Sequence, residues 1–304
     1  MDFVVGGVPD MAMERAGGPG HHGEVPREDG LMGGEGLMDA REQAFLAASA
    51  FVERSGSEAE RVRLRLLRGG TALSERDIAA ILADQRVDGG FAPFWTSTYS
   101  SVDATCFRLA QADQADAALD GGDAARALAF LAKRQESDGG WEEAMEVAPL
   151  APPWARPGDS SARLYLTANA GFWCAVGGRP EAAARAAELL RGAIDETGRL
   201  PSFLHANWLG AALLWHVGDL QSAERLLGYL SERLPELSAS SLAWLISSLV
   251  RAGVPPLAQI LESAGELLLA GQRGDGSFLS EDGPDFDVHA TLEAIRALRM
   301  TGRW

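Results

Sequence analysis

Four side chains of types that transfer protons recur at one position of four apolar segments with helical periodicity. These are Asp103, Tyr165, His205 and His289, each two residues before a Thr or an Asn. If the segments align on that Thr or Asn, the four side chains point into one cavity and form a polar ring. Burial in an apolar cavity disfavours the charged form of a carboxylic acid and raises its pKa. Asp103 is therefore a candidate proton donor to an alkene or an epoxide, with a histidine holding its geometry or reloading its proton from solvent.

The acidic members of these segments also have a structural interpretation. Asp and Ser are preferred at helix N-caps, where each stabilises the helix by about 1 kcal/mol. Asp287 follows Gly283-Pro284 at the start of its helical segment, so a cap is favoured there over a substrate contact. The sequence leaves both roles open for Asp103.

Aromatic side chains near these positions suit a path through carbocations, because a ring face next to a cation contributes roughly 0.5–2 kcal/mol. The candidate substrate contacts are Trp95, Phe172, Trp208, Asn207 and Asp287. A Trp on a buried helix belongs to the core more often than to a cation-binding wall. The sequence leaves both interpretations of these aromatic residues open.

Three repeated turns set the phase of the helices that must position these residues. Gln85 begins a Gln-x-x-Asp-Gly-Gly-Phe stretch, Gln135 begins Gln-x-x-Asp-Gly-Gly-Trp, and Gln272 begins Gln-x-x-Asp-Gly-Ser-Phe. Asp bonds its own backbone and Gly accepts positive φ, so each preceding helix must stop at the turn. Such a period predicts a repeat architecture.

The helical period predicts an all-α fold of twelve helices in six hairpins, closed into an (α/α)6 toroid with one helix of each pair inside and one outside. The inner helices should be apolar all round and the outer ones amphipathic. We expect a single toroid domain over 39–304 and a disordered N-terminal tail over 1–38, because Gly, Pro and charged residues dominate the tail. The expected pairs are 39–54 with 57–68, 74–85 with 101–112, 123–135 with 161–176, 180–194 with 201–217, 220–234 with 238–252, and 256–272 with 287–300.

The composition of the chain indicates which partners and which location to expect. The 304 residues are 46% hydrophobic, and 27 Lys and Arg stand against 43 Asp and Glu, giving a net charge of −16. Such a charge repels a phosphate-rich polymer, so a nucleic-acid partner is not expected. Two cysteines form no disulfide framework, no apolar run is long enough to cross a bilayer, and a cytoplasmic location is expected. No metal or cofactor is expected either.

The repeated turns resemble those of squalene–hopene cyclases, class II terpene cyclases and the β subunits of protein prenyltransferases, which share an α/α-toroid. In class II terpene cyclases the acid motif reads Asp-x-Asp-Asp-Thr, and two segments of this chain resemble it in part. Ser101-Val-Asp-Ala-Thr105 keeps the middle carboxylate, Asp103, and replaces both flanking ones. Asp287-Val-His-Ala-Thr291 keeps the first and has His289 at the donor position. The resemblance implies that Asp103 is the proton donor.

We therefore predict a bacterial, class II terpene-cyclase-like enzyme of specialised metabolism that cyclises a polyprenyl or meroterpenoid substrate by protonation. A single toroid would need to close its cavity by forming a homodimer or with its own loops, such as 144–159. One alternative is a non-catalytic toroid that binds an apolar ligand or a partner protein. Another is a zinc-dependent prenyltransferase-like subunit with Asp103, Cys106 and either His289 or His205 as ligands.

Overall fold

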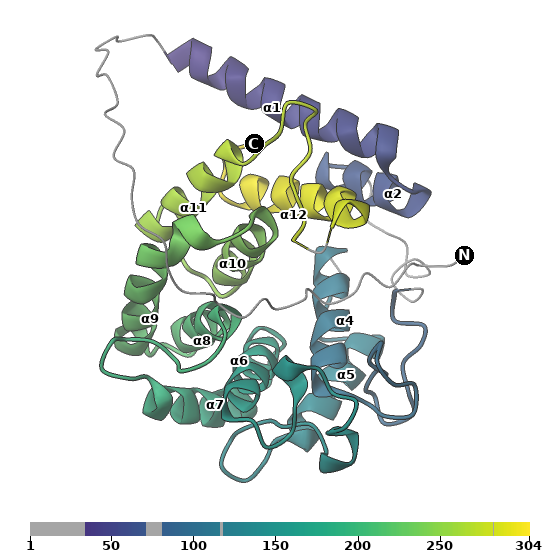
Figure 1. Cartoon of the computed structure of the whole chain (residues 1–304), viewed down its shortest axis with the longest axis vertical. Coiled ribbons are helices and arrows are strands. Elements are labelled where there is room, and N and C mark those ends of the chain that lie inside the picture. The colour runs from purple at the N-terminus through teal and green to yellow at the C-terminus, as the bar shows by residue number, and fades with distance from the viewer. Residues whose placement is uncertain (1–33, 71–80, 116–117, 282) are drawn as a thin grey trace.

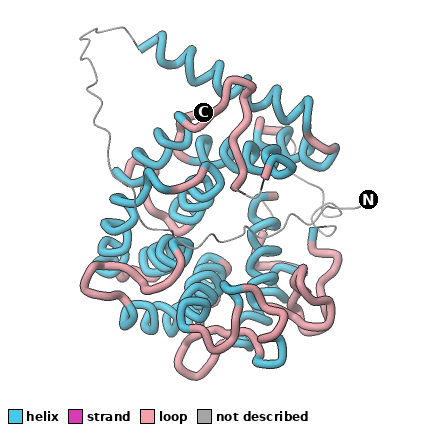
Figure 2. Tube along the Cα trace, in the orientation of Figure 1, coloured by secondary structure: helices cyan, strands magenta, loops and turns pink. Residues whose placement is uncertain are grey.

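A computed structural model describes residues 34–70, 81–115, 118–281 and 283–304. Within these ranges the chain forms eleven α-helices and no strand (Figure 2). The helices are α1 (Gly34–Ser55), α2 (Glu58–Leu67), α4 (Val102–Gln114), α5 (Gly122–Arg134), α6 (Ser160–Val176), α7 (Pro180–Ala193), α8 (Leu204–His216), α9 (Leu220–Arg233), α10 (Ala239–Arg251), α11 (Gln259–Ala270) and α12 (Asp287–Met300). The predicted helix at 74–85 falls largely outside the described residues, as does the expected tail up to residue 33.

The helices form two concentric layers (Figure 1). In the inner layer α4 packs on α6, α6 on α8, α8 on α10, α10 on α12 and α12 on α2. In the outer layer α5 packs against α4 and α6, α7 against α6 and α8, α9 against α8, α11 against α10 and α12, and α1 against α12 and α2. This is the predicted all-α toroid of sequential hairpins, and the fold prediction is confirmed.

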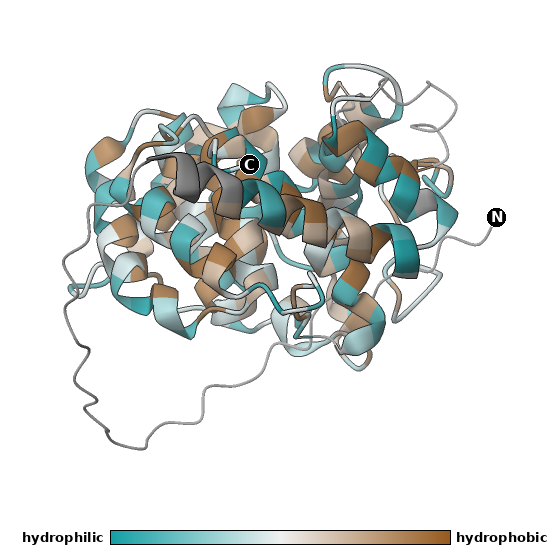
Figure 3. Ribbon diagram, turned by 90° about the horizontal axis from the view of Figure 1, so that it is seen from above, coloured by the Kyte–Doolittle hydropathy of each residue, from teal (hydrophilic) through white to brown (hydrophobic). Residues whose placement is uncertain are grey.

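Burial separates the two layers as the sequence predicted. In the inner helix α8 every residue from Ala206 to Leu214 is buried. The outer helix α7 buries only one stripe, made mostly of alanines, and exposes the rest. Helices on the outside of the molecule carry both polar and apolar residues in Figure 3. None of the described helices combines the length and the hydropathy needed to cross a membrane.

The three repeated turns join neighbouring hairpins. Nε2 of Gln85 donates to the carbonyl of Gly89 in its own turn at 2.9 Å and to the carbonyl of Asp123 in α5 at 2.7 Å. Gln135 does the same with its own turn and α7. The third glutamine, Gln272, donates to the carbonyl of Ala44 in α1 at 2.8 Å, and this bond joins the last hairpin to the first. The repeat therefore closes the ring.

A fourth turn, at 194–200, has the same backbone geometry without the sequence repeat. Asp195 N–H donates to the Arg199 carbonyl at 2.9 Å, as Arg86 does to Gly90 at the first turn. Gly198 has a φ of +83°, close to the +90° of Gly89. A glycine is required in both places because a side chain strains this conformation. The toroid geometry is thus preserved where the sequence signal has been lost.

Candidate active site

The start of α4 positions Asp103. Ser101 is the N-cap of the helix, and its Oγ accepts a hydrogen bond from the Ala104 N–H at 3.1 Å. Thr105 Oγ1 accepts from the Phe91 N–H at 3.2 Å and so ties the helix to the end of the first turn. Asp103 itself does not cap α4, so the capping interpretation of this residue is wrong. Its side chain is free to point across the toroid.

The Asp103 carboxylate is 5% exposed and receives a donor on each oxygen. Trp154 Nε1 donates to Oδ2 at 3.1 Å, and the Tyr165 hydroxyl donates to Oδ1 at 3.0 Å. Asn169 Nδ2 donates in turn to the Tyr165 oxygen at 3.2 Å. Trp154 belongs to the loop 144–159, which the sequence suggested as a cover for a single toroid. That loop lies directly on Asp103.

A second buried carboxylate, Glu143, lies behind Asp103 at the N-terminus of α4. Its Oε1 accepts from the Ser101 hydroxyl at 2.6 Å and from the Asp103 N–H at 3.1 Å. Its Oε2 accepts from the Tyr99 hydroxyl at 3.0 Å and from the Val102 N–H at 3.2 Å. Negative charge is favourable at a helix N-terminus, where N–H groups have no partner within the helix.

The surroundings of Asp103 favour its protonated form more than water does. Burial, and then the nearby charge of Glu143, raise its pKa from 3.8 to about 6, while the hydrogen bonds from Trp154 and Tyr165 oppose the rise. Burial also raises the pKa of Tyr165 well above its usual range, so this hydroxyl keeps its proton and remains a donor. Folding therefore increases the fraction of Asp103 that is protonated near neutral pH.

His205 lies in an aromatic cluster on α8 and α10. Its ring centroid is 4.5 Å from that of Trp208 and 5.0 Å from that of Trp244. Its Nε2 and the indole nitrogen of Trp208 are both buried and have no partner within the described part of the chain. Burial lowers the pKa of His205 to about 4, so the imidazole is neutral at physiological pH.

His289 belongs to a different network, between α2, α4 and α12. Its Nδ1 lies 3.2 Å from Nη1 of Arg63. The other terminal nitrogen of Arg63, Nη2, pairs with Glu293 at 2.6 Å and donates to Gln114 Oε1 at 3.2 Å. Burial, and then the charge of Arg63, lower the pKa of His289. Of the four residues of the expected ring, only Asp103 and Tyr165 are in hydrogen-bond contact within the described chain.

No group of three His, Cys, Asp or Glu side chains in the described ranges could hold a metal ion. Cys106 is buried one turn after Asp103, and burial raises the pKa of its thiol well above the usual range. A cysteine binds zinc as the thiolate. Neither His205 nor His289 comes to this pair, so the residues present do not fit the zinc alternative.

The other predicted substrate contacts differ in how deeply they are buried. Phe172 and Trp208 are 1% and 0% exposed, so they pack in the core between helices and do not line a solvent-reached wall. Trp95 is half-buried against the core in the loop before α4.

Asn207 and Asp287 hold loop backbone. Asn207 Oδ1 accepts from the Leu200 N–H at 2.8 Å, which is the bond that Thr105 makes at the first turn. Asp287 Oδ1 accepts from the Ser280 N–H at 2.9 Å, and α12 has no side-chain cap. The expected cap at Asp287 is therefore wrong, because the carboxylate turns back to the preceding loop.

Ion pairs join the inner helices at the end of α4 away from Asp103. Asp113 contacts Arg251 of α10 at 2.8 Å and Arg296 of α12 at 2.6 Å. Ten residues of helix separate Asp103 from Asp113, which corresponds to about 15 Å. Since these pairs cross between non-neighbouring inner helices, they obstruct that end of the ring.

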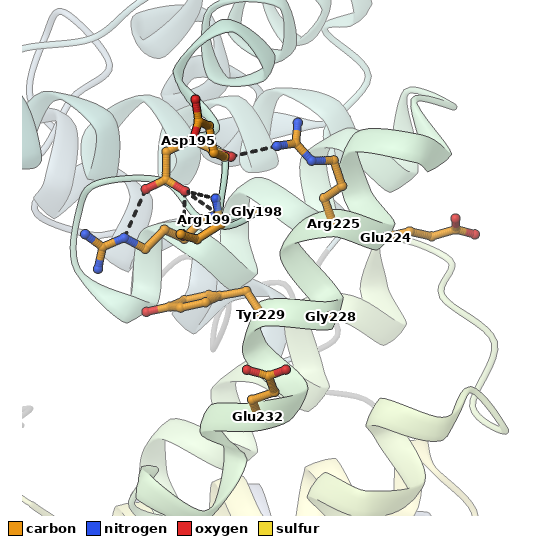
Figure 4. A pocket seen from close by; sticks show the side chains of 10 residues that line it. Asp195, Gly198, Arg199, Glu224, Arg225, Gly228, Tyr229 and Glu232 are labelled. Atoms are coloured by element: carbon orange, nitrogen blue, oxygen red, sulfur yellow. Dashed lines mark hydrogen bonds and ion pairs between the residues drawn. The ribbon is translucent and has the colours of Figure 1, made fainter.

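A groove lies elsewhere, on the outer surface between the fourth turn and α9 (Figure 4). It has a volume of about 650 Å³. Among its lining residues, Asp195 Oδ2 pairs with Arg199 Nε at 3.1 Å, and Arg225 Nη2 donates to the Asp195 carbonyl at 2.6 Å. The groove is open, and none of the candidate catalytic residues lines it.

The described helices have the same overall fold as solved type II terpene cyclases. The apo structure of the type II terpene cyclase MstE from Scytonema matches with a TM-score of 0.58 and 17% identity, over 88% of this chain and 99% of that one. A variant of MstE in complex with geranylgeranyl dihydroxybenzoate, its substrate, matches with a TM-score of 0.57 and 16% identity, over 89% and 100%. A protein from Actinoplanes matches with a TM-score of 0.55 and 17% identity, over 85% and 89%. No family model and no curated protein matches the chain.

The sequence predicted Tyr165 beside Asp103 but not the other groups around this carboxylate. Trp154, Glu143 and Tyr99 lie in loops whose positions no helical period predicts. Glu143 follows the second repeated turn by two residues, so the turn itself was the available signal. Asn169, one helical turn after Tyr165, could have been found from the i, i+4 spacing.

Proposed function

We propose that this protein is a type II terpene-cyclase-like enzyme in which Asp103 starts the cyclisation of a polyprenyl or meroterpenoid substrate by protonating it. The observation that carries the proposal is the Asp103 carboxylate, buried in a terpene-cyclase toroid with a donor on each oxygen. Burial favours its acid form, and the two donors stabilise the conjugate base that remains after proton transfer. The resemblance to MstE, solved with an isoprenoid substrate, supports the substrate class.

The proposed reaction is an isomerisation. The carboxyl proton of Asp103 passes to a terminal alkene carbon, whose π electrons form the new C–H bond and leave a tertiary carbocation. The π electrons of the next alkene then form a ring C–C bond and transfer the charge along the chain. Loss of a proton from the last cation forms the product alkene, so no electron acceptor is required.

Five further residues take part in this proposal. Tyr165 orients Asp103 and remains protonated. His205 is neutral with an unpartnered Nε2, so it is a base for the final proton, and the face of Trp244 beside it stabilises the cation. His289, neutral beside Arg63, belongs to the opposite side of the proposed cavity. Trp95 contributes an aromatic face from the loop before α4.

The test is incubation of the purified protein with geranylgeranyl dihydroxybenzoate, farnesyl and geranylgeranyl diphosphate, squalene and their terminal epoxides. Mass spectrometry and NMR would identify a cyclic isomer of unchanged mass. We expect product with wild type and with the surface variant Asp195→Asn, and none with Asp103→Asn. Product that persists in Asp103→Asn refutes the assigned acid. No product from any substrate supports the non-catalytic alternative.

A further inference from the structure

Glu143 is a buried carboxylate, 3% exposed, and the proposed reaction does not use it. All four of its hydrogen-bond partners are donors: two hydroxyls and two backbone N–H groups. The ionised carboxylate is the form that only accepts hydrogen bonds. The site therefore holds a buried negative charge at the backbone of Asp103.

The hydrogen bonds of Glu143 converge on one turn of helix. They engage Ser101, Val102 and Asp103, which are the N-cap and the first two residues of α4. A shift of this turn would move the Asp103 carboxylate relative to Trp154 and Tyr165. Glu143 thus fixes the backbone that carries the acid, while the Asp103 side chain points away to other partners.

We propose that Glu143 is a positioning residue that favours the protonated, donating form of Asp103 and fixes the helical turn that carries it. This inference rests on the proposed function of Asp103. Two like charges close together in a buried site disfavour ionisation of the second. Because Glu143 accepts from four donors and Asp103 from two, the negative charge of Glu143 favours the protonated form of Asp103.

The other ionisable groups near the pair leave this assignment in place. Cys106 and Tyr165 face Asp103, and both are neutral because burial raises the pKa of each. Arg134 reaches Glu143 only through Tyr99, whose hydroxyl it contacts at 2.5 Å. Tyr99 is neutral as well, since burial and the charge of Glu143 raise its pKa to about 12. Glu143 is accordingly the charged side chain that acts on Asp103.

The experiment is an NMR titration of the Asp103 carboxyl carbon in the full chain, with the signal assigned by its loss in Asp103→Asn. We expect Glu143→Gln to lower the titration midpoint by about one pH unit, because the like charge is removed. Ser101→Ala removes one donor and the helix cap but keeps the charge, so its midpoint should not fall. An unchanged midpoint in folded Glu143→Gln overturns the proposal.

If Glu143→Gln does not fold, Tyr99→Phe supplies the test. It keeps the charge of Glu143 and removes one compensating donor, so the midpoint of Asp103 should rise, and an unchanged or lower midpoint overturns the proposal. The titration needs no substrate, so its result is independent of whether cyclisation is found. With an active substrate, the pH profile of kcat should shift in the same direction as the midpoint.

Discussion

Replacing Asp103 by Asn is expected to stabilise the folded protein at neutral pH while it removes the proposed acid. The pKa of Asp103 is raised from 3.8 to about 6 on folding, chiefly by burial. A raised pKa means that the folded state binds more protons than the unfolded state between these two values, so stability falls as pH rises through this window. At about 1.36 kcal/mol for each pH unit, the buried charge costs about 3 kcal/mol above pH 6.

Asn has the shape of Asp and no charge, so the variant avoids this cost. Its Oδ1 can accept from Trp154, and its Nδ2 can donate to the Tyr165 oxygen, because a hydroxyl both donates and accepts. Packing around the side chain is therefore conserved. The expected gain is about 3 kcal/mol at pH 7.5, and it disappears below pH 4, where Asp103 is protonated in both states.

Urea denaturation at pH 7.5 and pH 4 measures the difference, provided that the m value is unchanged. Asp195→Asn is the matched control, and its effect on stability at pH 7.5 should have the opposite sign. A hydrogen bond from the Thr197 hydroxyl is the main cause that lowers the pKa of the exposed Asp195 to about 2, so this variant should lose stability at pH 7.5. An Asp103→Asn variant that is less stable than wild type at pH 7.5, or equally shifted at both pH values, would refute the reasoning.

Four further variants and reactions test the toroid and the site. Gln272→Ala removes the ring-closing bond and should cost about 1–3 kcal/mol in urea denaturation. Thr291→Val leaves the buried Phe278 N–H unpaired, and a similar loss of stability is expected. In Gly139→Ala the new Cβ would lie 2.5 Å from a backbone oxygen at a φ of +94°, so thermal unfolding should occur at a clearly lower temperature. Buried Cys106, with its raised pKa, should react with iodoacetamide only after denaturation, as mass spectrometry can show.

The sequence by itself determined the toroid. Three turns of the form Gln-x-x-Asp-Gly-Gly/Ser and a helical period between them were sufficient, because each turn uses local chemistry. In each turn Asp bonds the N–H two residues later, and a glycine adopts positive φ. The Thr or Asn that aligned the inner helices also has one role in four places, since each accepts from the N–H that ends its turn.

The surroundings of Asp103 were decided only by the tertiary structure. Ser101 and Ala104 stand where the related motif has carboxylates, so the local sequence suggests an isolated acid. Folding brings Glu143 and Trp154 to it from a loop that has no helical period. Likewise, His205 and His289 share a sequence position with Asp103 but have different neighbours, because side chains at one level of a ring are separated by its width. The local pattern specifies the helices and turns, whereas contacts across the ring decide which groups meet.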